Sequence, residues 1–99
     1  MRLTELQRTF ICQTVSNVIG PDARIILFGS RLDDSARGGD LDLLVESDEL
    51  PTLMQRSRIK LALESSLFMP VDIVAIKRNA QPTAFQRIAL ATGAPLGSE

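Results

Sequence analysis

The feature that most constrains this chain is a continuous apolar run that ends at a small-residue turn and is followed by two closely spaced carboxylates. The run covers residues 23–28, and Gly29 and Ser30 come directly after it. Nine residues then separate Ser30 from Asp40, and Asp42 follows two positions later. A run of this length that is apolar at every position except Arg24 predicts a strand that is buried on both faces. The fold is therefore expected to contain a sheet covered by helices.

Hydrophobic spacing and turn residues predict the remaining elements. Proline and glycine mark most of the boundaries, and Thr4 with Gln7 forms a candidate capping pair at the first helix. The predicted order is helix 4–19, strand 23–28, strand 41–46, helix 52–67, strand 71–76 and helix 83–91, with a short final strand at 94–96. This order predicts an α/β fold, a small mixed sheet of three to four strands with helices packed on it, in one domain covering 1–99.

Composition excludes several classes of function. The net charge is −1, with 11 basic and 12 acidic residues, so no basic face is expected and no direct nucleic-acid binding is predicted. The chain has no histidine, which excludes histidine-based zinc sites and general bases and leaves oxygen ligands and Mg²⁺. No apolar run is long enough to span a membrane, and the first residues lack the apolar centre of a signal peptide. We therefore expect a cytoplasmic protein.

The turn at Gly29 and Ser30 is a candidate phosphate-binding site. Glycine lets a phosphate approach the backbone N–H groups closely, and the serine hydroxyl adds a donor. Arg31 and Arg37 flank this turn and are candidates to neutralise triphosphate oxygens, with Arg24 a weaker one. The alternatives are an ordinary strand-to-helix turn and solvated surface arginines.

Asp40 and Asp42 are candidate metal ligands. Two residues apart at the start of a strand, their side chains point to the same face. At about 4 Å and an effective dielectric constant near 20, two such charges repel by roughly 4 kcal/mol, and a cation between them removes this cost. Mg²⁺ binds in this way, through carboxylates, phosphate oxygens and water. The alternative is a solvated loop that merely begins a strand.

Asp72 is the third candidate, because it interrupts an apolar run that continues through Ile76. A charge in a strand buried on both faces requires an ion pair or a metal. Beside Asp40 and Asp42 it would complete a site for two Mg²⁺ ions and could accept the proton of an attacking hydroxyl. The alternative is an edge-strand residue that faces solvent. Lys77 is a further, weaker candidate for phosphate.

Together these residues resemble the signature of the DNA polymerase beta-like nucleotidyltransferase superfamily, in particular its minimal members. The similarity rests on Phe28 to Arg31, on Gly39 to Val45 and on Val71 to Val74, and extends over nearly the whole chain. Two departures are visible: the segment between Ser30 and Asp40 is one residue shorter than is usual, and Gly39 stands where serine is common.

The resemblance implies transfer of a nucleoside monophosphate from ATP to an acceptor. By position, Asp40, Asp42 and Asp72 would bind Mg²⁺, Asp72 would assist deprotonation, and Gly29 and Ser30 would hold the phosphates. It also implies an antitoxin that modifies a hydroxyl of a HEPN-type RNase toxin. Masking of the toxin without catalysis, transfer to a small molecule such as an aminoglycoside, and assembly into a homo-oligomer remain open at this stage.

Overall fold

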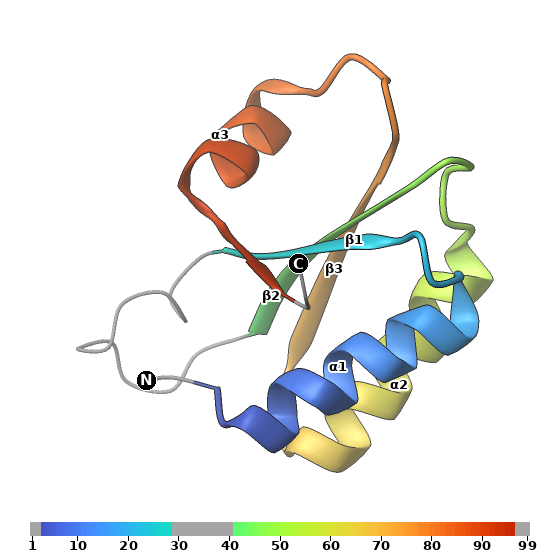
Figure 1. Ribbon diagram of the computed structural model, residues 1–99, viewed down its shortest axis with the longest axis vertical. Helices are drawn as coiled ribbons and strands as arrows, with labels where there is room; N and C mark the ends of the chain where they lie inside the picture. Colours follow the sequence, from blue (N-terminus) through green and yellow to red (C-terminus); the bar gives the residue numbers. More distant parts are fainter. Residues whose placement is uncertain (1–2, 29–40, 97–99) are drawn as a thin grey trace.

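The computed structural model describes residues 3–28 and 41–96. Its elements, in chain order, are α1 (Glu5–Val18), β1 (Arg24–Phe28), β2 (Leu41–Ser47), α2 (Leu53–Leu67), β3 (Val71–Lys77), α3 (Ala84–Thr92) and β4 (Ala94–Leu96). The strands form one sheet in the order β3-β2-β1-β4, in which β2 and β3 are parallel and β1 is antiparallel to both of its neighbours (Figure 1). The predicted mixed α/β fold and the short final strand are confirmed.

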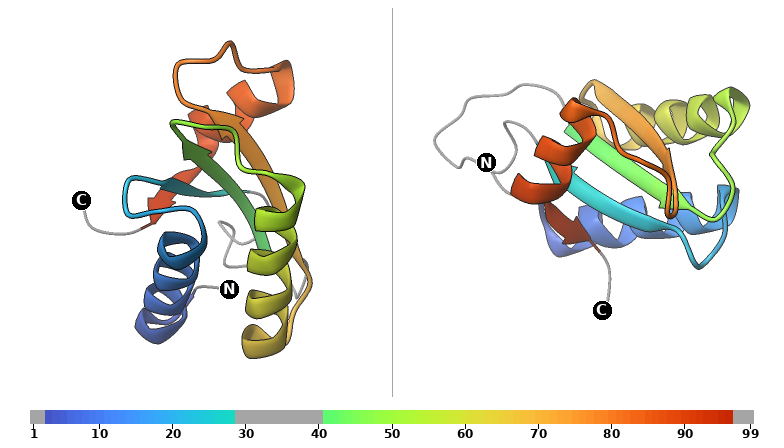
Figure 2. Two further views of the ribbon diagram at one scale, coloured as in Figure 1. Left: turned by 90° about the vertical axis from the view of Figure 1, so that its right-hand side faces the viewer. Right: turned by 90° about the horizontal axis from the view of Figure 1, so that it is seen from above.

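The sheet is covered by α1 and α2 on one face and by α3 on the other (Figures 1 and 2). Side chains alternate along the strands, so β1, β2 and β3 each contribute to two separate clusters. The larger cluster packs the sheet against α1 and α2 and includes Ile11, Val15, Leu41, Leu43, Val45, Ile59 and Leu63. The smaller cluster lies on the face of α3 and contains Ile26, Phe28, Leu44, Ile76 and Ala89. Within the described residues, no helix is both long and apolar enough to cross a membrane.

The three helices begin with the same local structure, a threonine whose side chain accepts a hydrogen bond from the backbone N–H three residues on. The glutamine at that position reciprocates by accepting from the backbone N–H of the threonine. The pairs are Thr4 with Gln7, Thr52 with Gln55, and Thr83 with Gln86. The predicted Thr4–Gln7 cap is confirmed. The two prolines that marked the other helix starts each lie one residue before the capping threonine.

Gly93 ends α3, as predicted, and allows the chain to pass close over β1 into β4. A Cβ atom at this position would lie 2.4 Å from Ile26 Cγ2 and 2.6 Å from the carbonyl oxygen of Ala89. Its φ of −81° is open to any residue. The requirement for glycine is therefore one of space, and it sets how closely α3 lies on the sheet.

Candidate active site

The candidate site lies at the end of the sheet where β2 and β3 begin and β1 ends. Phe28 is the register partner of Asp42 across the antiparallel pair, and Asp42 is the partner of Asp72 across the parallel pair. Directly opposed residues share a face of a sheet, and neighbouring strands are about 4.8 Å apart. The three side chains therefore form a row on the face that α3 covers.

A cavity of about 510 Å³ lies above this row, between the sheet and α3. This volume is within the range of small-molecule sites in proteins, roughly 300–1,000 Å³. The sheet contributes two carboxylates and two apolar side chains, and α3 contributes the other four lining residues. The lining consists of Phe28, Asp42, Asp72, Val74, Phe85, Ile88, Ala89 and Thr92. The predicted pairing of Asp42 with Asp72 is thus observed, inside a hollow of suitable size.

The environment predicted for Asp72 is wrong in one respect. We expected a strand buried on both faces, but β3 is an edge strand and the Asp72 side chain is 59% exposed. The sequence of β3 resembles that of a central strand because it supplies apolar residues to both faces of the sheet. Val71 and Ile76 are both buried, one on each face. Exposure removes the argument that Asp72 needs a metal in order to be stable. It also leaves the carboxylate accessible to a second substrate from the edge of the sheet.

Two residues of α2 hold the backbone just before Asp72. Glu64 accepts a hydrogen bond from the Val71 N–H at 2.8 Å, and the Lys60 ammonium donates to the Val71 carbonyl at 2.5 Å. Lys60 also lies 3.3 Å from Glu64 and 3.8 Å from Asp72 Oδ1. The hydrogen bond from Val71, assisted by Lys60, lowers the pKa of Glu64. Lys60 and Glu64 together form what we call the clamp. It provides hydrogen-bond partners for the Val71 N–H and C=O on the edge strand β3, next to Asp72.

The row supplies hard oxygen ligands for a divalent cation. Two carboxylates on adjacent strands, beside space for a phosphate and water, fit the preference of Mg²⁺. No group of three acidic or thiol side chains that could hold a metal ion occurs within residues 3–28 and 41–96. The predicted third ligand, Asp40, lies outside the described residues, as do Gly29, Ser30, Arg31 and Arg37. The described part of the site therefore contains two of the three candidate ligands, Asp42 and Asp72.

The weaker phosphate candidates do not belong to this site. Arg24 opposes Glu46, with 3.7 Å between the charged atoms, and Lys77 opposes Ser47. Both register positions lie at the far end of the sheet from Asp42, since Glu46 and Ser47 are four and five positions further along β2. These two predictions are wrong for different reasons. Arg24 begins β1, which runs antiparallel to β2, whereas Lys77 ends β3, which runs parallel to β2, so both lie at the end of the sheet away from Asp42.

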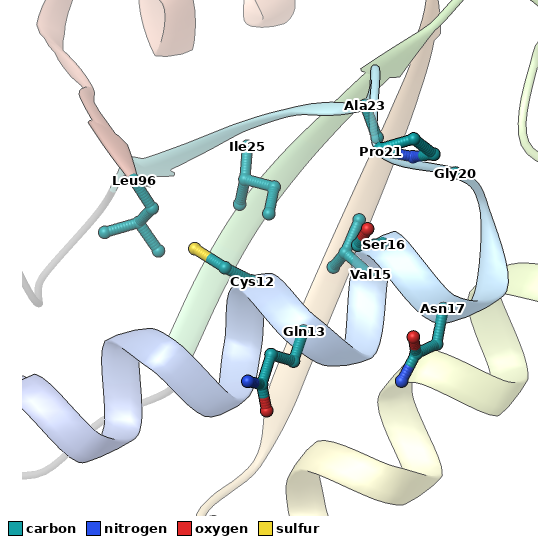
Figure 3. A pocket seen from close by; sticks show the side chains of 10 residues that line it. All are labelled: Cys12, Gln13, Val15, Ser16, Asn17, Gly20, Pro21, Ala23, Ile25 and Leu96. Carbon is teal, nitrogen blue, oxygen red and sulfur yellow. The ribbon is translucent and has the colours of Figure 1, made fainter. Parts of the chain in front are cut away.

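A second hollow, of about 390 Å³, lies between α1 and the strands β1 and β4 (Figure 3). Polar side chains of α1 line it, and the Cys12 side chain points toward the sheet. Burial raises the pKa of the Cys12 thiol, which keeps it protonated and unreactive. No acidic side chain is among the described residues around this hollow, so it lacks the chemistry of the site under α3.

Sequence reasoning missed part of the site. Phe85, Ile88 and Ala89 share the face of α3 that lines the cavity, and their contribution to a site was not predicted. Ala89 is buried there, whereas Phe85 and Ile88 are 55% and 62% exposed. The clamp was also missed. Its signal was the spacing of Lys60 and Glu64, four residues apart on a helix that leads into the strand of Asp72.

Comparisons with solved structures show what the fold is similar to. A structure of a tri-AMPylated Shewanella oneidensis HEPN toxin in complex with MNT antitoxin matches with a TM-score of 0.73 and 22% identity, over 98% of this chain and 74% of that one. A mutant of the MntA–HpeT toxin–antitoxin pair matches with a TM-score of 0.74 and 22% identity, over 93% of this chain and 73% of that one.

A minimal nucleotidyltransferase is more similar in sequence, at 30% identity, with a TM-score of 0.69 over 92% of this chain and 90% of that one. Comparison with curated protein sequences gave no match. The family model described as polymerase beta, nucleotidyltransferase, matches residues 11–98. With this match and the arrangement of Asp42 and Asp72, the chain belongs to the polymerase beta nucleotidyltransferase family.

Proposed function

We propose that this chain is a Mg²⁺-dependent nucleotidyltransferase that moves AMP from ATP to a hydroxyl group of a partner protein. One observation carries the proposal, namely the register that makes Asp42 and Asp72 neighbours inside the cavity under α3. A pair of carboxylates beside a hollow of ligand size is what metal-assisted phosphoryl chemistry requires.

Each residue has a role in this proposal. Asp42 and Asp72, with Asp40, hold the metal, and Gly29 and Ser30 hold the triphosphate. When bound, Mg²⁺ neutralises phosphate oxygens and supports the departure of pyrophosphate.

Asp72 has a second task, for which its exposure is suitable. Its side chain is accessible at the edge of the sheet, where it accepts the proton of the attacking hydroxyl. Arg31 and Arg37 neutralise the triphosphate as charge develops on the leaving group. The clamp of Lys60 and Glu64 keeps the backbone of β3 in register, so that the two carboxylates stay side by side.

We further propose that the acceptor is a HEPN-type RNase toxin and that the chain acts in the cytoplasm as its antitoxin. The structural neighbours support this partner, since they include an AMPylated HEPN toxin in complex with an MNT antitoxin. The open edge of β3 beside Asp72 is compatible with an acceptor as large as a protein.

Masking of the toxin without catalysis is a second candidate, supported by the outer surface of α2. Met54 and Leu61 are 74% and 65% exposed and lie seven residues apart on α2. Seven-residue spacing places side chains along one side of a helix, as in contacts between helices. Neither residue lines the cavity under α3, so this surface could bind a partner whether or not the site is active.

The discriminating experiment measures transfer of labelled AMP from ATP to a HEPN-type toxin that co-purifies with this chain. The proposal predicts Mg²⁺-dependent labelling of the toxin by the wild type and none by Asp42→Asn, while both proteins still bind the toxin. A complex that forms equally well and is labelled by neither would establish masking instead.

A further inference from the structure

The cavity under α3 has an apolar side that metal binding does not use. Phe85, Ile88 and Val74 form this side, which we call the apolar wall, and Phe28 lies behind Phe85. We propose that the apolar wall binds the base of the nucleotide by stacking and van der Waals contact, so that the site prefers purines to pyrimidines and accepts adenine and guanine alike. This inference rests on the proposed nucleotidyl transfer and specifies its substrate.

The exposure of the wall points to a ligand. Ala89 is 2% exposed and packs α3 onto the sheet, whereas Phe85 and Ile88, on the neighbouring turn, are more than half exposed. Two large apolar side chains over a hollow lose little of their contact with water when the chain folds. Covering them with a flat apolar surface would remove that contact, which is energetically favourable. A nucleobase is such a surface, since every base has a π face.

Phe85 is held in place for stacking. Its ring contacts the Phe28 ring in a T-shaped arrangement, with 5.6 Å between the ring centroids and 76° between the planes. Phe28 is itself 8% exposed and is fixed in the smaller cluster. A ring supported in this way loses little freedom on binding, which favours affinity.

The side-chain donors of the described lining residues do not distinguish one purine from another. The Thr92 hydroxyl donates to the Ile88 carbonyl at 2.7 Å, so its hydrogen is already used. Asp42 and Asp72 are acceptors when ionised and are assigned to the metal. Adenine and guanine differ in which edge atoms donate and accept. Among the described lining residues, no side-chain donor is therefore available to read this difference, whereas the larger stacking area of a purine favours both over a pyrimidine.

The position of the wall assigns it to the nucleotide and not to the acceptor. Phe28 stands at the end of the row next to β1, under α3, whereas Asp72 stands at the opposite end, on the open edge strand. In Figure 2, α3 lies over β1 and leaves the edge strand β3 open, so Asp72 is the part of the row that is accessible to a protein acceptor. The covered side is left for the smaller substrate.

The experiment measures binding of the Mg²⁺ complexes of four ligands: tripolyphosphate and non-hydrolysable analogues of ATP, GTP and CTP. Tripolyphosphate carries no base and reports the phosphate and metal site alone. The proteins are wild type, Phe85→Ala, Phe85→Leu and the matched control Phe68→Ala, which removes an exposed phenyl ring outside the cavity.

We expect Phe85→Ala to weaken binding of the ATP and GTP analogues by about 5- to 150-fold, the range for loss of one base–aromatic stack. Tripolyphosphate binding should be unchanged, which also shows that the variant is folded. Phe85→Leu should narrow the gap between the purine and CTP analogues, and Phe68→Ala should behave as wild type.

Three results would overturn the inference. Equal affinity of wild type and Phe85→Ala for the ATP analogue would show that the apolar wall does not bind the base. A more than tenfold preference for ATP over GTP would show that the edge of the base is read. If tripolyphosphate binds as tightly as the nucleotide analogues, the protein has a phosphate site but no base subsite. If none of the four ligands binds, the proposed function itself is refuted.

Discussion

Asp42 and Asp72 are direct partners in the parallel register of β2 and β3, although thirty positions of chain separate them. Their proximity depends on strand pairing and needs no particular side-chain contact. The pairing is fixed at its start by the Leu41 N–H, which donates to the Pro70 carbonyl at 2.9 Å, and by the clamp on Val71. A slip by one residue would turn one carboxylate to the opposite face, so the register of the sheet is part of the candidate site.

Loss of the α2 cap should destabilise the fold measurably. Thr52→Ala removes the side-chain oxygen that accepts from the Gln55 N–H at 3.0 Å. We expect a cost of about 1 kcal/mol and a fall in Tm of about 4–8 °C. Thr52→Ser keeps the oxygen and should stay close to wild type. Equal thermal melting of the two variants would contradict the role of the cap.

Gly93→Ala should be destabilising through overpacking. The new methyl group would meet Ile26 Cγ2 and the Ala89 carbonyl, so α3 must move away from β1. Overpacking of this kind costs about 1–3 kcal/mol, measurable by urea unfolding. Ile26→Ala removes one of the clashing atoms, so the double variant should cost less than the sum of the two single variants. Strict additivity would show that the Ile26 contact is not responsible.

The Glu64 carboxylate should make stability depend on pH in the acid range. Its pKa is lowered from 4.5 in the folded state, chiefly by the hydrogen bond from Val71. The stabilisation is therefore fully present above about pH 4.5 and is lost as the pH falls through the lowered folded value. Wild type should exceed Glu64→Gln in urea unfolding at neutral pH, and the difference should shrink in acid. A difference that grew in acid would reverse the predicted sign.

Phe68 ends α2 in an unfavourable conformation, with φ 57°, ψ 44° and a ring that is 89% exposed. The left-handed region costs a residue with a side chain about 1–2 kcal/mol, a cost that glycine avoids. We expect Phe68→Gly to raise the free energy of unfolding by at most about 1 kcal/mol, because glycine also gains freedom in the unfolded chain. Phe68→Ala keeps the Cβ atom and should give no gain. A lower Tm for Phe68→Gly would show that the ring stabilises the fold.

Much of the fold was predictable because its signals are local. The apolar run at 23–28 predicts a buried central strand, and Ile25 to Phe28 are indeed at most 8% exposed. The alternation after Asp40 placed Leu41, Leu43 and Val45 on the face opposite Asp42, as observed. The threonine and glutamine spacing that caps α2 and α3 is also present in the sequence, one residue after each of the two prolines that predict the helix starts.

The misjudged features depend on the order of strands, which local patterns do not contain. Nothing near Asp72 indicates that β3 lies at the edge, since Val71 and Ile76 are as buried there as in a central strand. The contribution of Phe85 and Ile88 follows from how α3 crosses the sheet, which Gly93 and Ala89 determine by their packing. The proximity of Asp42 and Asp72 was expected if their two strands were neighbours, and the parallel register of β2 and β3 provides it.

The central claim is a Mg²⁺-dependent nucleotide site built on Asp42 and Asp72. Calorimetric titration of a non-hydrolysable ATP analogue tests it most directly, with and without Mg²⁺, into wild type and the Asp42→Asn/Asp72→Asn double variant. Circular dichroism confirms that both proteins are folded. We predict saturable, Mg²⁺-dependent binding to the wild type and none to the double variant. Equal affinity of the two proteins would contradict the claim, because the site would then not depend on these carboxylates.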